Sequence, residues 1–156
     1  MNPKLINGNR IFDNRGSLRF SNELNFKNIK RFYTVHNYTK NFIRAWHGHI
    51  NEEKYIGCIK GTFQVSAVKI DNVKKPNKKN EIHSYFLNES NNNFVHVPKG
   101  FANGSISLED NSELLIFSTS STNLSRLRET TKRDFKSGSR STLVSTFHLM
   151  PCMISK

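Results

Sequence analysis

The chain has 156 residues, of which 35% are hydrophobic, and its formal net charge is +12. This length suits one domain with a core of its own, and no apolar run approaches the ~20 residues that a membrane helix needs. The N-terminal residues lack the apolar segment of a signal peptide, which predicts a cytoplasmic protein with no membrane partner.

The positive charge is compatible with nucleic-acid binding, but the Lys and Arg residues are scattered along the chain. The densest group, at 72–80, also contains Pro and Asn and is typical of a solvated loop. We therefore predict no nucleic-acid partner. A basic groove for an anionic small molecule, such as a nucleotide diphosphate, explains part of the charge.

Short runs rich in Val, Ile, Phe and Tyr follow one another along the first 120 residues, separated by Gly, Asn, Asp and Pro. No stretch in this part has helical periodicity. We predict a bend at Gly61 and strands within residues 16–22, 30–38, 41–49, 54–70, 82–87, 94–98, 102–108 and 113–120. Many short strands in a chain of this length favour an all-β sandwich or small barrel, and above all a jelly roll.

Composition changes near residue 121. We expect a jelly-roll domain over 1–121 and a basic, Ser/Thr-rich tail over 122–156 that is peripheral or partly disordered. Only two cysteines are present, Cys58 and Cys152, so there is no disulfide framework and no CxxC metal pair. Cys58 lies in an apolar run, which predicts a buried free thiol.

His47 and His49 are one residue apart on a predicted strand, so both imidazoles should face the same side. Metal-binding cupin barrels use this HxH spacing, with a Glu and another His as the remaining ligands. Here Lys54 and Asn103 stand in those two places, and an ammonium group repels a divalent cation. Glu53 is adjacent, so a metal site of His47, His49 and Glu53 remains an alternative, although we expect no metal and no cofactor.

Three segments in the same order carry a more specific resemblance: "RAWHGH…EKYIGCIKG", "VHVPKGFANG" and "ELLIFSTS". Together with the upstream "FDNRGSLRF", they resemble the dTDP-4-dehydrorhamnose 3,5-epimerase family over roughly residues 10 to 120. That family consists of jelly-roll cupins that act on nucleotide-linked 4-keto sugars. The resemblance implies a homodimeric epimerase or isomerase of a nucleotide sugar, acting in surface-polysaccharide biosynthesis.

The resemblance also implies roles for individual residues. His47 matches the general base and Lys54 the lysine beside the substrate's carbonyl oxygen. The expected substrate-binding residues are Arg44 and Arg15 at the diphosphate, where Arg15 reaches in from a partner subunit, together with Asn37, His49 and Asn103.

These residue types suit the chemistry. An imidazole that titrates near neutral pH can remove a proton beside a ketone, a cation stabilises the resulting enolate, and guanidinium groups bind a diphosphate. A structural reading of His47 as an ordinary wall residue of the barrel competes with this one. Alternation predicts that Trp46 faces away from His47, and that Tyr55 faces away from Lys54.

The pattern departs from the family at one important position. The tyrosine that returns a proton on the opposite sugar face is replaced by Ile116 or Phe117. Three outcomes stay open: another group or water reprotonates the sugar, the protein works on one face or one centre only, or it binds a nucleotide sugar without turnover.

Overall fold

The computed structural model describes residues 1–72, 77 and 79–121, and the backbone of a last short strand. No helix occurs in this part of the chain, and so none that could cross a membrane. The strands are β1 (Lys4–Ile6), β2 (Asn9–Asp13), β3 (Gly16–Phe20), β4 (Arg31–Asn37), β5 (Ile43–His49), β6 (Lys54–Lys60), β7 (Thr62–Lys69), β8 (Ile82–Asn88), β9 (Phe94–Val97), β10 (Phe101–Ser107), β11 (Ser112–Ser118) and β12 (Met153–Ser155).

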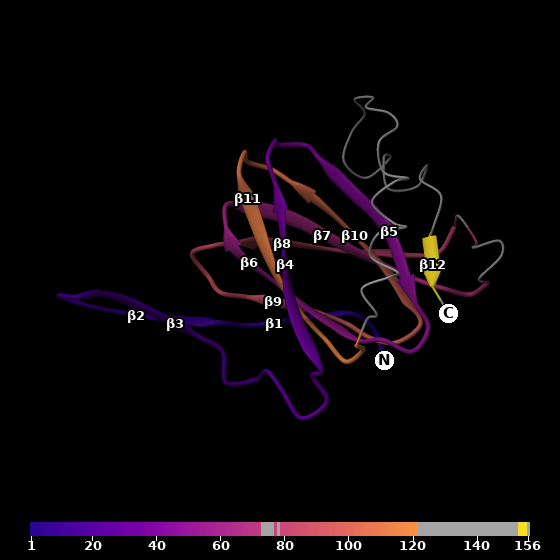
Figure 1. Ribbon diagram of the computed structural model, residues 1–156, viewed down its shortest axis with the longest axis horizontal. Coiled ribbons are helices and arrows are strands. Elements are labelled where there is room, and N and C mark those ends of the chain that lie inside the picture. Colours follow the sequence, from indigo (N-terminus) through magenta and orange to yellow (C-terminus); the bar gives the residue numbers. More distant parts are fainter. Residues whose placement is uncertain (73–76, 78, 122–152, 156) are drawn as a thin grey trace.

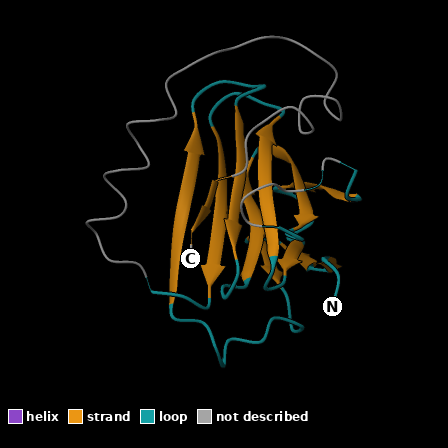
Figure 2. Ribbon diagram, turned by 90° about the vertical axis from the view of Figure 1, so that its right-hand side faces the viewer, coloured by secondary structure: helices purple, strands orange, loops and turns teal. Residues whose placement is uncertain are grey.

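The strands form two five-stranded sheets in the orders β1-β9-β6-β11-β4 and β12-β5-β10-β7-β8. Consecutive strands are rarely neighbours, because the chain crosses repeatedly from one sheet to the other. Figure 2 shows the strands of this all-β molecule standing side by side. Each run that the sequence predicted as a strand contains one, so the expected all-β class is confirmed.

The core lies between the two sheets and follows the two-residue period of the strands. On β7, Phe63, Val65 and Ala67 are fully buried, and they pack in one cluster with Leu114 and Ile116 of the opposite sheet. Burying aliphatic and aromatic side chains of this size stabilises a fold by roughly 1.5–3 kcal/mol each. The same alternation fixes which polar residues face the interior.

The chain changes sheet at Gly61, between β6 and β7. Gly61 has a φ of +72°, a conformation that residues with a Cβ avoid, and a Cβ there would stand 2.3 Å from Ser112 Oγ. The Cys58 thiol donates to the Gly61 carbonyl at 3.0 Å and is buried and free, as predicted. The predicted bend at Gly61 is therefore a crossing between sheets.

A second apolar cluster covers the outer side of the β5-β10-β7 sheet. Trp46, Ala102 and Ile106 form its buried part. On β10, Phe101 and Asn103 flank Ala102 and face the interior instead, and Asn103 lies opposite His47. The prediction that Trp46 faces away from His47 is thus confirmed.

Strands β2 and β3 form a hairpin that projects from the body of the molecule (Figure 1). Both strands are exposed along nearly their whole length, including Ile11, Phe12 and Leu18. At one edge of the sheet that contains β5, strand β12 pairs in parallel with β5, and Met153 lies opposite His47. The rest of the predicted tail lies outside the described residues.

Candidate active site

The centre of the candidate site is the interior side of the β5–β10 pair. His47 lies directly opposite Asn103, and Arg44 opposite Ser105, with a β-bulge between the two pairs. Directly opposed residues share a face of the sheet, and His49 lies opposite the core residue Phe101. His47, His49 and Arg44 therefore all belong to the interior side of β5.

Lys54 reaches this centre from the opposite sheet. It is the first residue of β6, only 6% exposed, and its ammonium Nζ lies 3.4 Å from Asn103 Oδ1. Asn103 thus contacts the cation and lies opposite His47 on the neighbouring strand. Burial lowers the pKa of Lys54, the charge of Glu52 opposes that effect, and Arg31 lowers the pKa further.

Arg44 and Asn37 meet at one end of the interior. Arg44 Nε donates to Asn37 Oδ1 at 2.7 Å, and the Asn37 amide donates to the Phe42 carbonyl at 3.3 Å. Asn37 is 2% exposed and fixes the guanidinium. Arg44 precedes His47 by three residues, or about 10 Å along an extended strand.

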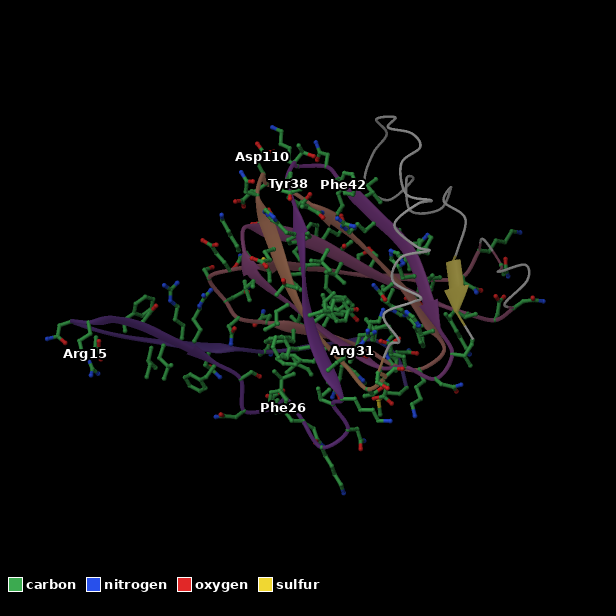
Figure 3. All side chains as sticks on the ribbon, viewed as in Figure 1. Arg15, Phe26, Arg31, Tyr38, Phe42 and Asp110 are labelled. Carbon is green, nitrogen blue, oxygen red and sulfur yellow. The ribbon has the colours of Figure 1, made fainter. Side chains whose placement is uncertain are left out.

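Of the predicted site residues, Arg15 is the one that does not lie at the barrel in a single subunit. It lies at the tip of the projecting hairpin, far from Arg31 and the barrel (Figure 3). Its side chain is 86% exposed and pairs with Asp13 at 2.6 Å, and this hydrogen bond lowers the pKa of Asp13.

The structure adds a group that sequence reasoning missed: Glu52, in the connection between β5 and β6. It is 7% exposed, and its Oε2 lies 2.9 Å from His49 Nδ1. Its Oε1 accepts from Ser118 Oγ at 2.5 Å and from Arg31 Nη2 at 3.3 Å. Burial alone would raise the pKa of Glu52, but the hydrogen bond from His49, the charge of Lys54 and the Ser118 hydroxyl lower it to about 2.

Tyr33 is a second residue that the sequence did not single out. It packs against the interior cluster, with the Arg31 guanidinium 4.9 Å from the centre of its ring. Burial and the negative charge of Glu52 raise the pKa of Tyr33 to about 12. The phenol therefore stays protonated and can donate a hydrogen bond.

The alternative metal set of His47, His49 and Glu53 is not assembled. Glu53 Oε2 lies 3.3 Å from His96 Nε2, and Tyr55 stacks on the His96 ring. Tyr55 thus faces away from Lys54, as alternation predicted. No group of three potential metal-ligating side chains occurs among the described residues.

The interior therefore combines several cations with one buried carboxylate. Arg44 lies at one end, His47, Asn103 and the Lys54 ammonium at the centre, and Arg31, His49 and Glu52 at the other end. Such an arrangement attracts an anionic ligand and directs an imidazole and an ammonium from the two facing sheets into one interior. These are the two groups that proton removal beside a carbonyl requires.

Fold and site together define a jelly-roll barrel with a polar, cationic interior. Residues 1–131 match the family model described as "FdtA: WxcM-like, C-terminal", and the chain belongs to that family. No curated protein sequence matches the chain.

Solved structures show the same fold. A dTDP-4-dehydrorhamnose 3,5-epimerase from Bacillus anthracis aligns with a TM-score of 0.64 at 18% identity, over 79% of this chain and 75% of that one. The WlaRB TDP-quinovose 3,4-ketoisomerase from Campylobacter jejuni gives 0.60 at 23% identity, over 79% and 88%. A 3,4-ketoisomerase from Helicobacter canadensis gives 0.62 at 22% identity, over 87% and 99%. The predicted cupin jelly roll and the predicted relationship are confirmed.

Proposed function

We propose that the protein is an isomerase of a nucleotide-linked 4-keto-6-deoxy sugar that works by removing a proton beside the ketone. One observation carries this proposal: Lys54 Nζ lies 3.4 Å from Asn103, which is directly opposite His47. The family, and solved neighbours named as epimerases and ketoisomerases of such sugars, support the same reaction class.

In the proposed mechanism, His47 takes the proton from the carbon next to the carbonyl. The electron pair of the broken C–H bond forms the C=C bond of an enolate, and the negative charge develops on the former carbonyl oxygen. The Lys54 ammonium stabilises that oxygen. Asn103 hydrogen-bonds a neighbouring sugar oxygen, since an amide both donates and accepts.

Carbonyl migration suits this interior better than inversion of two carbons. Inversion requires proton return on the opposite face of the sugar. The residues considered for that donor are Ile116, which is buried in the core, and Phe117, and neither side chain can donate a proton. Migration from C4 to C3 moves the C3 proton to His47 and the O3 proton to solvent, while one new proton goes to the former carbonyl oxygen O4 and another to C4. One catalytic face can perform all of these steps.

Deuterium incorporation tests the function. A dTDP-linked 4-keto-6-deoxyhexose is incubated with the protein in D₂O and followed by NMR. Migration yields a 3-keto sugar with deuterium at C4, whereas 3,5-epimerisation yields deuterium at C3 and C5 with the ketone still at C4. The variant His47→Ala should lose exchange and retain nucleotide binding, and His36→Ala, at an exposed position of β4, should behave as wild type.

Two other results would redirect the assignment. Binding of the nucleotide sugar without any deuterium incorporation by wild type would identify a non-catalytic sugar-nucleotide-binding protein. Stoichiometric zinc, iron or manganese in the purified protein would instead favour the metal-dependent alternative. The cytoplasmic location and the role in surface-polysaccharide assembly are further proposals that rest on the family relationship.

We also propose a homodimer in which the hairpin of one subunit brings Arg15 to the diphosphate site of the other. Ile11, Phe12 and Leu18 on the hairpin are 55%, 70% and 59% exposed, which a partner surface would relieve. Sedimentation should show that Phe12→Asp yields monomers. Phe86→Asp, at a similarly exposed position of β8, should remain dimeric.

Subunit complementation tests the shared site directly. Arg15→Ala and His47→Ala homodimers should each be weak or inactive. Random reassembly of the two should recover roughly a quarter of wild-type activity, because half of the dimers are mixed and each has one intact site. Absence of recovery, with mixed dimers demonstrated, would contradict the exchange of Arg15.

A further inference from the structure

Glu52 connects the two sheets at one end of the barrel interior. Ser118 lies opposite Arg31 on one side and opposite Lys54 on the other, so these three residues form a row across β4, β11 and β6. Glu52 receives hydrogen bonds from two members of this row, Ser118 and Arg31, and contacts His49 at the end of β5. Glu52 is buried, and its three contacts, with Ser118, Arg31 and His49, are all to groups that can donate a hydrogen bond.

This geometry fixes the chemistry of the His49 ring. An ionised carboxylate can only accept hydrogen bonds, so the Nδ1 atom 2.9 Å from Glu52 Oε2 must carry a proton. The pKa of Glu52, lowered to about 2, keeps the carboxylate ionised. In the neutral ring Nε2 is then the nitrogen without a proton, and it is free of the contact with Glu52.

The same carboxylate acts on Lys54. The charged groups that influence the ammonium are Glu52 from the β5–β6 connection and Arg31 from β4. Burial and Arg31 disfavour the cation, and Glu52 favours it. Loss of the Glu52 charge should therefore let Lys54 lose its proton at a lower pH.

We propose that Glu52 is a positioning residue that orients His49 through Nδ1 and holds Lys54 as a cation, so that the two act on the substrate as one acid–base unit. This inference rests on the proposed isomerase function and names a residue that the sequence comparison with epimerases did not assign.

Nitrogen-15 NMR of the wild-type protein tests the orientation without any turnover. The His49 signals are assigned by their loss in His49→Gln. The expected result is a neutral His49 ring that carries its proton on Nδ1, the nitrogen that faces Glu52. A neutral His49 that carries its proton on Nε2 would overturn the proposal, and this measurement needs no variant at Glu52.

Variants test the coupling. Glu52→Gln should lower the kcat for deuterium exchange on the order of ten- to a hundredfold, with KM changed little, because acid–base groups contribute at about this level. The alkaline limb of its pH profile should move to lower pH. Glu52→Asp, which keeps the negative charge, should restore part of the kcat and reverse part of the shift in the pH profile. Glu53→Gln removes the adjacent carboxylate, which contacts His96 outside the site, and should match wild type.

Equal losses in the Gln and Asp variants with an unmoved pH profile would indicate a merely structural role and refute the coupling. Failure of the proposed function looks different: wild type itself would show no exchange. In that case the NMR measurement would still decide the orientation of His49.

Discussion

Tyr33 on β4 lies directly opposite Ile116 on β11, on the interior side of the sheet. Ile116 is one of the two residues, with Phe117, considered for the place of the family's proton-donating tyrosine. Tyr33 thus brings a phenol of the neighbouring strand beside this position. Burial and Glu52 raise its pKa to about 12, which keeps the hydroxyl protonated through the neutral range.

Tyr33→Phe should therefore slow exchange by about tenfold or more while leaving nucleotide affinity intact, because the sugar loses a neutral hydrogen-bond donor. Single-turnover exchange and equilibrium binding of the nucleotide measure the two effects. Tyr38→Phe, at an exposed position, is the control. A Tyr33→Phe protein with wild-type turnover would remove the phenol from the mechanism.

Lys54→Met should reduce exchange on the order of a hundredfold, the typical loss when one group that stabilises an oxyanion is removed. Nucleotide affinity should change little, because Arg44, the proposed diphosphate ligand, lies at one end of the interior, away from Lys54. In wild type, burial lowers the pKa of Lys54, so activity should decline on the alkaline side at a pH below the usual lysine value of about 10.4. Undiminished exchange in the methionine variant would exclude Lys54 as the enolate-stabilising cation.

Glu52 should make the fold sensitive to acid. Its pKa is lowered from 4.5 to about 2, so its contribution to stability is complete above about pH 4.5 and is lost as the pH falls through 2. The shift corresponds to about 3 kcal/mol. Denaturant unfolding at several pH values should show the free-energy difference between wild type and Glu52→Gln shrinking over this window. A difference that stays constant from pH 5 to 2 would contradict the lowered pKa.

Two glycines test the crossing between sheets. Gly61 and Gly100 have similar φ values, +72° and +76°. A Cβ at Gly61 would lie 2.3 Å from Ser112 Oγ, whereas a Cβ at Gly100 would have no described atom within 4 Å beyond its own residue and its two chain neighbours. Gly100→Ala should cost about 1–2 kcal/mol of unfolding free energy through backbone strain. Gly61→Ala should cost roughly 1–3 kcal/mol more through the added clash. Equal losses would mean that Ser112 moves aside freely.

Local patterns were sufficient for most of the fold. The alternation of apolar residues predicted β4 to β11, and the same period placed Trp46 and Tyr55 on the faces where the structure has them. Strands β1 and β2 were missed because three residues, or a run as polar as Asn9–Asp13, give too little pattern to detect.

The missed parts of the site depend on pairing between distant segments. Tyr33 and Ile116 are far apart in the sequence, so only the β4–β11 register brings them together. Glu52 precedes β6, where the two-residue period does not apply, and sequence reasoning considered Glu53 instead. In the structure Glu53 contacts His96, and Glu52 contacts His49.

The projecting hairpin gives the protein a part whose order depends on its surroundings. An isolated two-stranded ribbon is at best marginally stable in water, and β2 and β3 are exposed on both faces. At low protein concentration this arm should therefore become a substrate for trypsin, at Arg10, Arg15 or Arg19, while the barrel remains intact. Dilution would then expose the arm to cleavage and remove Arg15 from the protein while the barrel stays folded.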